Sequence, residues 1–387
     1  MDFHPLEHHQ MLADTIGRFL RERYAIEARH GISGSADGWS RQHWQALADL
    51  GVVGALLPEH AGGFGGTGSD IAIVFEQLGR GLVVEPFLGT LMAGRILAEA
   101  GGWEETLGRV IAGACVLAFA HEEPGGRHAG TSMTTRATQT PTGWVLTGEK
   151  IVIPQLGAAD QIVVSARISG SEDDLGLFLV DNGGSGVECR GYPLIDGGRG
   201  GDLRLTAAPA TLVAMSGQPI IQRAMAAGIT ALVWEAVGVM EVLKHSTLEY
   251  LRTRRQFGMP IGAFQALRHR IATIAVEIEQ ARSAAINAAD ALESAASERE
   301  RLIAAGKYTI GRAGTLVAEE AIQMHGGIGM AWENRVAHYA KRLTMIDHQL
   351  GDEDYHLARF IALSRGALNT GTQSSTSNGR GRTFDVS

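Results

Sequence analysis

The sequence has few of the residues that mark disulfide-rich, metal-binding or membrane proteins. Its 387 residues include two cysteines, Cys115 and Cys189, and neither lies in a C-x-x-C or other metal-type spacing. We expect two buried or half-buried thiols in a reducing cytoplasm. No uninterrupted run of about 18 apolar residues occurs, and charge appears at the very start of the chain. The sequence therefore predicts neither a signal peptide nor a membrane span.

An excess of positive charge is also absent. The chain has 34 Lys and Arg against 42 Asp and Glu, a formal net charge of −8, which argues against a nucleic-acid partner. His4, His8 and His9 lie close in sequence, but no Cys or carboxylate cluster accompanies them. We interpret them as a solvated face and predict no metal site.

Hydrophobic periodicity divides the chain into four parts. Residues 1–115 repeat apolar side chains at helical spacing, which predicts an N-terminal helical domain. Residues 116–215 hold short β-rich runs between Gly, Asp and Asn clusters, which predicts a compact β domain. Helical periodicity returns over 220–366 and predicts a bundle of long helices. Residues 367–387 are polar and Gly-rich, and we expect a disordered tail.

Finer expectations follow for two of these parts. The run 143–153 alternates apolar and polar residues and predicts a hairpin turning at Thr147-Gly148. In the C-terminal part the expected long helices span 222–254, 263–294, 297–325 and 332–349, with a shorter helix after Asp352.

A glycine-rich stretch, Gly63 to Gly68, matches G-x-G-x-x-G formally. A dinucleotide fingerprint must follow a buried strand and open the helix of a βαβ unit. This stretch follows LLPEHAG in a helical region. We therefore expect a glycine-rich turn between helices and no Rossmann fold.

The most informative segment is 250–265, YLRTRRQFGMPIGAFQ. Arg254 can offer a bidentate fork to a diphosphate, and Phe257 can pack against a flat ring. Gly258 favours a turn, and Gln265 offers amide donors and acceptors. A helix-turn-helix corner with solvated arginines explains the same composition, so the residue types alone leave both interpretations open.

In order and spacing, this segment resembles the acyl-CoA dehydrogenase family pattern Y-x-x-x-R-x-Q-F-G-x-P-I-x-x-F-Q. Residues 323–329, QMHGGIG, resemble the family's Q-x-x-G-G-x-G, and LLPEHAGGFGGTGSD resembles its P-E-x-x-G-G-x-G stretch. The resemblance covers residues 1–366. It implies a mostly α fold with N-terminal helices, a middle β barrel and a C-terminal four-helix bundle. It also implies FAD, an acyl-CoA substrate oxidised at Cα–Cβ, and electron-transfer flavoprotein or a similar acceptor.

The resemblance also assigns cofactor contacts residue by residue. In the family these elements reach a neighbouring subunit's FAD across an interface. The matching FAD-binding candidates are Arg254, Gln256, Phe257, Ile261, Phe264, Gln265, Gln323, Gly326 and Gly327.

The sequence departs from the family where a subunit serves its own flavin. The family's T-E-P-G-x-G-S-D is replaced by residues 122–129, EEPGGRHA, which lack the Thr, Ser and Asp. The family's aromatic-Ile-Thr strand is replaced by residues 152–154, VIP, and proline removes a hydrogen-bond donor. Gly228 and Leu350 occupy the two positions where family members carry the glutamate base. Neither side chain can accept the α-proton.

The nearest carboxylate on the helix of Gly228 is Glu235. It lies two turns further on, about 10 Å along the axis and on the same face. It is the candidate base that remains, although a paired or solvated helix carboxylate is the favoured interpretation.

The sequence keeps the family motifs that reach a neighbouring subunit's FAD, and it lacks the motifs that contact the subunit's own FAD. This pattern resembles the non-base subunit of a heteromeric acyl-CoA dehydrogenase and implies a heterotetramer with a second dehydrogenase subunit. The runs EAVGVMEVL, YLRTRRQFG and HYAKRLTMIDHQLGDEDYHLAR resemble those of the pimeloyl-CoA dehydrogenase small subunit. Two alternatives stay open. One is a self-sufficient homo-oligomer using Glu235 or another acid, and the other is a flavin-free scaffold or regulatory subunit.

Overall fold

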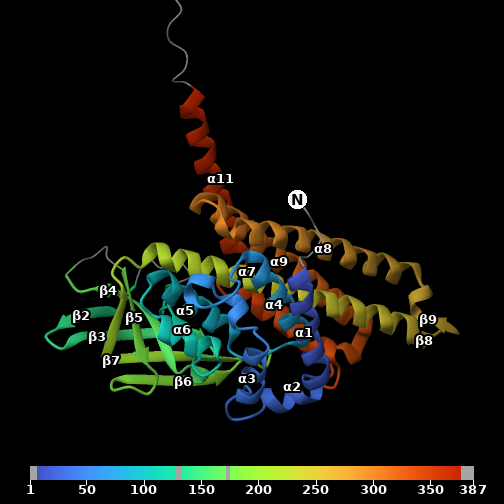
Figure 1. Cartoon of the computed structure of the whole chain (residues 1–387). Coiled ribbons are helices and arrows are strands. Elements are labelled where there is room, and N and C mark those ends of the chain that lie inside the picture. Colours follow the sequence, from blue (N-terminus) through green and yellow to red (C-terminus); the bar gives the residue numbers. More distant parts are fainter. Residues whose placement is uncertain (1–6, 127–132, 171–174, 376–387) are drawn as a thin grey trace, which may run out of the picture.

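The computed structural model describes residues 7–126, 133–170 and 175–375, with side chains as far as residue 365. In chain order, helices come first, then seven strands, then a second set of helices (Figure 1). The predicted fold class, mostly α with a middle β barrel, is confirmed.

The N-terminal part is helical because its apolar residues recur on one face of each segment. The glycine-rich stretch forms a turn that leads into α4, as predicted, and Thr67 caps that helix through a reciprocal box with Asp70. The helices are α1 (Glu7–Arg23), α2 (Ile26–Ser33), α3 (Arg41–Asp49), α4 (Gly68–Gly81), α5 (Phe87–Ala100) and α6 (Glu104–Ile111), with short 3-10 turns η1 (Gly54–Leu56) and η2 (Glu59–Ala61).

The middle part is a β sheet that closes on itself. Strand pairs β4–β2, β2–β3, β3–β7, β7–β5 and β5–β4 form a ring, β1 joins beside β4, and β6 pairs with β7. Closure leaves few free edges and encloses a separate apolar core. The strands are β1 (Leu117–Ala120), β2 (Arg136–Thr140), β3 (Gly143–Pro154), β4 (Gln161–Ile168), β5 (Leu175–Asp181), β6 (Val187–Pro193) and β7 (Arg199–Ala214), and a 3-10 turn η3 (Leu156–Ala158) follows β3.

The hairpin predicted at Thr147-Gly148 is wrong. These residues lie inside the continuous strand β3, which is irregular against β7 between Leu146 and Gly148. A Cβ at Gly148 would lie 2.5 Å from Thr135 Oγ1, so the glycine permits a bulge with close packing and does not mark a turn. The chain reverses earlier, between β2 and β3.

The C-terminal part holds long helices near the four predicted spans, but the helix that begins at Glu353 covers 23 residues and is not the shorter helix expected there. They are α7 (Gln218–Thr253), α8 (Gln265–Asp290), α9 (Ala296–His325), α10 (Arg335–His348) and α11 (Glu353–Ser375), joined by β8 (Arg255–Gln256), β9 (Met259–Pro260), η4 (Ile261–Ala263), η5 (Ala291–Glu293) and η6 (Gly326–Met330). Helix α11 continues beyond residue 367, where the tail was expected to begin. Residues 376–387 lie outside the described part.

Helix α7 lies at the centre of the molecule. It is long and apolar enough to cross a membrane, but 94% of its most apolar window is buried inside the protein, as expected of a core helix. Two glycines bring it against α4. A Cβ at Gly238 would lie 2.1 Å from Glu76 O, and one at Gly79 would lie 2.2 Å from Glu235 O. This close crossing fixes the position of Glu235.

Candidate active site

The stretches that depart from the family pattern line one cavity. Its volume is about 370 Å³, and it lies between the β barrel, α5 and the end of α10. Most of its lining side chains are apolar. The lining includes Met92, Phe119, His121, Glu122, Glu123, Gly125, Gly126, Ile151, Val152, Ile153, Pro154, Met225 and Leu350. Residues 127–129 of the first departing stretch lie outside the described part of the chain.

Gly228 and Leu350 meet in space, although 122 positions separate them in sequence. A Cβ at Gly228 would lie 2.7 Å from Met92 Sδ and 3.0 Å from Leu350 Cδ1. The side chains of Met92 and Leu350 thus fill the space in front of residue 228, the first base position. Leu350 itself occupies the second base position. No proton acceptor can stand at this point.

A buried lysine holds the loop that carries Leu350. Lys307 Nζ donates hydrogen bonds to Asp347 O at 2.7 Å and to Gly351 O at 2.6 Å. Leu350 adopts a φ of +57°, which costs a branched residue roughly 1–2 kcal/mol, so the surrounding contacts must fix it. Burial lowers the pKa of Lys307 to about 8.

Glu235 is locked in an ion pair. Arg342 Nε and an Nη donate to its two carboxylate oxygens at 2.6 and 2.7 Å, and Arg342 also pairs with Asp196 at 2.9 Å. Its side chain lines only a small cavity of about 60 Å³ and neither of the two larger cavities around Leu350. Both oxygens of the candidate base Glu235 accept from the guanidinium, and the side chain faces away from the two cavities large enough for a substrate.

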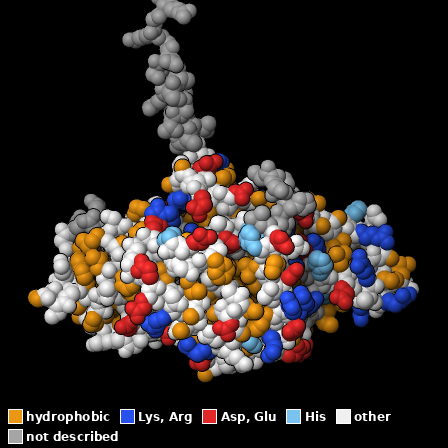
Figure 2. Space-filling model, viewed as in Figure 1, with side chains coloured by type: hydrophobic (Ala, Val, Ile, Leu, Met, Phe, Trp, Pro, Cys, Tyr) orange, Lys and Arg blue, Asp and Glu red, His pale blue; other side chains and the backbone are white. Residues whose placement is uncertain are grey.

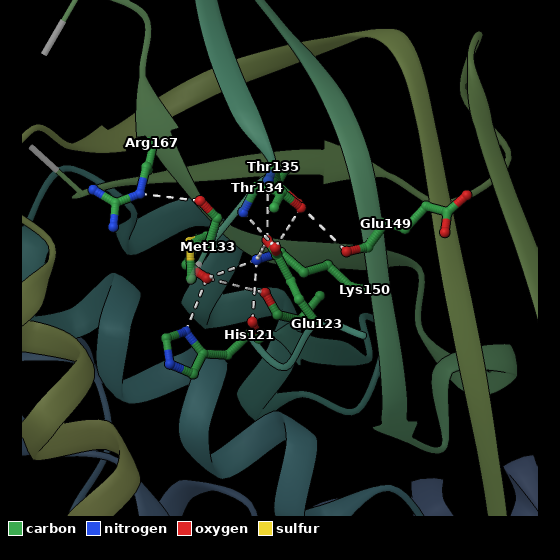
Figure 3. Close-up of polar contacts among 10 residues, drawn as sticks. His121, Glu123, Met133, Thr134, Thr135, Glu149, Lys150 and Arg167 are labelled. Atoms are coloured by element: carbon green, nitrogen blue, oxygen red, sulfur yellow. Dashed lines mark hydrogen bonds and ion pairs between the residues drawn. The ribbon is translucent and has the colours of Figure 1, made fainter. Parts of the chain in front are cut away.

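A buried polar cluster lies inside the barrel beside the cavity (Figure 3). Lys150 is fully buried, and its Nζ lies 2.8 Å from Glu123 Oε1. The backbone N–H groups of Thr134 and Thr135 also donate to Glu123. Burial opposes ionisation, but Lys150 and these donors outweigh it and lower the pKa of Glu123 to about 2. Glu123 is therefore a fixed carboxylate.

Sequence reasoning missed this cluster. In the structure His121 lines the cavity, and Lys150 supports this wall through hydrogen bonds to His121 O and to Glu123. A lysine in the apolar-alternating strand β3 was the available signal, because an unpaired buried lysine is costly and needs a carboxylate partner. Nothing in the sequence pattern indicates His121.

The strand that replaces the family's aromatic-Ile-Thr element is bulged. Between Lys150 and Ile153 the pairing of β3 with β7 is irregular, and Val152 has a φ of +54°. The Val152 N–H already donates to Asp202 Oδ1 at 3.2 Å, and Pro154 has no N–H. This segment thus offers little hydrogen bonding to a ring in the cavity.

The segment 250–265 forms the tip of the helical bundle. A two-residue turn, Phe257-Gly258, joins β8 to β9, and both residues have positive φ. Phe257 is 87% exposed and packs edge-on against Phe264 at 6.0 Å. The Arg254 side chain is exposed and makes no hydrogen bond or ion pair with the described residues. Hydrophobic and basic side chains adjoin at this end of the molecule (Figure 2).

The second family-like segment lies beside the first. Tyr250 near the end of α7 stacks on His325 at the end of α9, with ring centroids 4.5 Å apart. Gln323, Gly326 and Gly327 are all exposed. Together with the exposed Gln256 and Gln265 and the half-buried Ile261, the predicted FAD-binding residues therefore gather at one end of the bundle.

These residues are remote from the cavity in the same chain. Figure 1 shows β8 and β9 at the end of the molecule opposite the β barrel, whose strands line the cavity. Within one chain, the predicted FAD-binding residues therefore lie far from the cavity. The family resemblance implies a site in which these two parts come from neighbouring subunits.

A second cavity adjoins the first. Its volume is about 310 Å³, and α7, α9 and α11 form most of its wall. His121, Met225 and Leu350 line both cavities and so mark their junction. The second cavity is more polar, with Gln218, Gln222 and the paired Glu300 and Arg359 in its wall.

The solvated face predicted for the N-terminal histidines is wrong for His9, which is buried and pairs with Asp70, whereas His8 is exposed. His8, His9 and Asp70 bring one potential ligand atom each within 4.8 Å of one another. However, Asp70 Oδ1 pairs with His9 at 3.0 Å, and its Oδ2 accepts from the Thr67 backbone in the capping box. His4 lies outside the described residues.

Comparisons with known proteins agree along most of the chain. Residues 6–105 match the model "Acyl-CoA dehydrogenase, N-terminal domain", and residues 215–362 match "Acyl-CoA dehydrogenase, C-terminal domain". The acyl-CoA dehydrogenase IpdE2 of Mycobacterium tuberculosis is 28% identical over 87% of this chain and 91% of its own length.

Two solved structures share the fold and have two-component names. A chain of a variant of the "Tcur3481-Tcur3483 steroid ACAD" is 28% identical, with a TM-score of 0.84 over 94% of this chain and 99% of that chain. A chain of the ChsE4-ChsE5 complex from Mycobacterium tuberculosis is 25% identical, with a TM-score of 0.85 over 95% and 99%.

Proposed function

Since the chain belongs to the acyl-CoA dehydrogenase family, we propose that it is the non-base subunit of a heteromeric, FAD-dependent member. In this assembly a second dehydrogenase subunit supplies the glutamate base. The chain contributes exposed bundle residues to an FAD shared across the interface, and the pair desaturates an acyl-CoA thioester between Cα and Cβ.

The observation that carries the proposal is the contact between Gly228 and Leu350. A general base must reach the α-proton directly or through one water. Both positions that could hold it are apolar here, and Leu350 and Met92 fill the space between them. Glu235 is poorly placed to replace the base, because Arg342 pairs with its carboxylate and the side chain lines neither of the two larger cavities.

Other acids near the cavities are also poor bases. Glu123 is paired with Lys150 and ionised with a pKa of about 2, so it has little tendency to take a proton. Glu300 pairs with Arg359 in the adjoining cavity. Glu122 lines the 370 Å³ cavity and is the acid on which a self-sufficient enzyme would have to depend. It is therefore included in the test below.

The bundle tip fits an FAD shared with a partner. FAD joins a diphosphate to flat aromatic rings, and it would supply the hydride acceptor when bound. Arg254 offers the diphosphate a guanidinium that pairs with none of the residues described, and Phe257 and Phe264 offer exposed rings in the same segment. Gln256, Ile261, Gln265, Gln323, Gly326 and Gly327 would complete this surface. An 87% exposed phenylalanine in a strained left-handed turn is costly unless something covers it.

Two further assignments belong to the same proposal. The two-component names of the relatives support a second dehydrogenase subunit as the partner, in an assembly that we propose is a heterotetramer, and an electron-transfer flavoprotein or similar carrier would reoxidise the flavin. The two cysteines are unpaired, which supports a reducing cytoplasm. A flavin-free scaffold would keep the fold but would have no reason to keep, in one segment, exposed rings and an Arg254 that pairs with no residue in the described ranges.

Flavin content and turnover test the proposal together. The full chain is purified alone and after coexpression with a family member that carries T-E-P-G-x-G-S-D and a helix glutamate. We expect the chain alone to be helical, oligomeric and poor in FAD, and the pair to hold about one FAD per heterodimer and to oxidise acyl-CoA. One reduced FAD per protomer in the chain alone, after addition of a short acyl-CoA, contradicts the proposal. If Glu122→Gln abolishes that reaction, Glu122 is the base.

A further inference from the structure

His121 lies where the two cavities meet. It follows β1 directly and lines both the 310 Å³ and the 370 Å³ cavity, together with Met225 and Leu350. Its ring stacks on Phe119, with centroids 5.6 Å apart and an interplanar angle of 17°. Met225 and Leu350 are apolar, so His121 is the polar side chain among the three residues at the junction.

The hydrogen bonds of Lys150 determine the role of Ser165. An ammonium group has three protons and no acceptor. Lys150 Nζ directs them to His121 O at 3.1 Å, Glu123 Oε1 at 2.8 Å and Ser165 Oγ at 3.3 Å. Ser165 Oγ therefore accepts from Lys150 and has its own proton to donate elsewhere.

Ser165 in turn determines the tautomer of His121. Ser165 Oγ lies 2.9 Å from His121 Nδ1 and 3.5 Å from Ala120 O, so its proton goes to the nearer ring nitrogen. Nδ1 is then an acceptor, and the proton of the neutral ring must be on Nε2. Burial, and then the charge of Lys150, lower the pKa of His121 to about 4, so the ring is neutral near pH 7.

The Nε2–H group has no hydrogen-bond partner among the described residues. Figure 3 shows this nitrogen on the side of the ring turned away from the Lys150 cluster, and α7 residues line the cavity on which His121 borders. On its other side His121 borders the mainly apolar 370 Å³ cavity. A fixed neutral donor at this wall suits an uncharged acceptor, because a carboxylate buried there would also need a compensating cation.

We propose that His121 Nε2–H donates a hydrogen bond to the carbonyl oxygen of an acyl thioester bound at the junction of the two cavities. The identity of the ligand as a thioester rests on the proposed function, whereas the donor and its direction rest on the contacts of Lys150 and Ser165. His121 is then a ligand-binding residue, and Ser165 and Lys150 position it.

Paired ligands isolate the carbonyl. Binding of butyryl-CoA and of its thioether analogue S-butyl-CoA, which lacks the carbonyl, is measured by calorimetry on the full chain purified alone. The wild type should prefer butyryl-CoA by roughly 3- to 10-fold, the effect of one neutral hydrogen bond. His121→Phe should remove this preference, and His121→Gln should keep part of it. His60→Phe, at an exposed histidine that lines neither cavity, is the matched control and should leave the preference unchanged.

The tautomer is tested separately by nitrogen NMR of histidine-labelled chain, with the His121 signal identified by its loss in His121→Phe. We expect a neutral ring protonated on Nε2, and a mixture of tautomers in Ser165→Ala. A ring protonated on Nδ1, no binding of butyryl-CoA, or equal preference in wild type and His121→Phe overturns the inference. None of these results affects the proposed function, which depends on flavin content and turnover of the assembled pair.

Discussion

Leu350 packs against Gly228, with its Cδ1 3.0 Å from the position that a Cβ at residue 228 would occupy. Family members can carry a catalytic glutamate at either position, and here the two positions are neighbours that exclude any side chain between them. The absence of an acid at these two positions is therefore part of the packing of the core.

A methyl group at residue 228 tests this contact. Gly228→Ala should destabilise the chain by about 1–3 kcal/mol, because the new Cβ overlaps Met92 and Leu350, measured by urea denaturation. Leu350→Ala should relieve part of the loss, so the double variant should be more stable than the sum of the two single changes. The control Gly108→Ala, on α6 with open space around its Cβ position, should be neutral or stabilising. Additive effects of the two changes would show that residues 228 and 350 do not touch.

Removal of Arg254 tests the FAD surface. Arg254→Ala should lower FAD affinity of the assembled pair by about tenfold or more, because a charge-assisted contact contributes roughly 1.5–3 kcal/mol. Flavin retention on gel filtration measures it. Arg252→Ala, an exposed arginine on the last turn of α7, is the matched control and should retain FAD. Equal retention in both variants would separate Arg254 from the cofactor.

Glu235→Gln should affect stability and not the chemical step. Removing one partner of a buried ion pair costs about 3–5 kcal/mol of stability. The loss in Glu235→Gln should be about 3 kcal/mol or less, because Asp196 still pairs with Arg342. Turnover of the folded assembled pair should change by less than about tenfold, whereas loss of a base lowers the rate roughly 10²–10⁴-fold. The exposed Glu249→Gln on the same helix controls for loss of charge. A thousandfold slower but fully folded and flavin-loaded variant would make Glu235 the base.

Glu85 should make stability depend on pH. Glu85 lies in the loop that joins α4 to α5 and is buried. Tyr24 donates to one of its oxygens at 2.7 Å, and burial raises the pKa of Glu85 to about 7. Between about pH 4.5 and 7 the folded state holds a proton that the unfolded state has lost, so stability falls as pH rises through this range, by roughly 3 kcal/mol in total. Glu85→Gln should remove this component. Parallel pH profiles for the two proteins would show that Glu85 ionises normally in the fold.

The sequence by itself determined the order of the parts and the family. Periodicity places the long helices within a few residues of α7 to α10, because a buried helical face must repeat its apolar residues every three or four positions. The ordered motif at 250–265 identifies the bundle tip, since a turn between helices is a local feature. Glycine at 228 and leucine at 350 establish from sequence alone that neither position holds an acid.

Tertiary structure decided everything that depends on contacts between distant segments. Arg342 pairs with Glu235 because α4 and α7 cross closely and α10 lies beside them. The sequence does not specify which of its many arginines reaches Glu235. The bulge at Gly148 could not be distinguished from a turn, since glycine permits both. His121 had no sequence signal at all. Its tautomer depends on Lys150 and Ser165, and the pairing of the strands brings β1, β3 and β4 together around the buried Lys150.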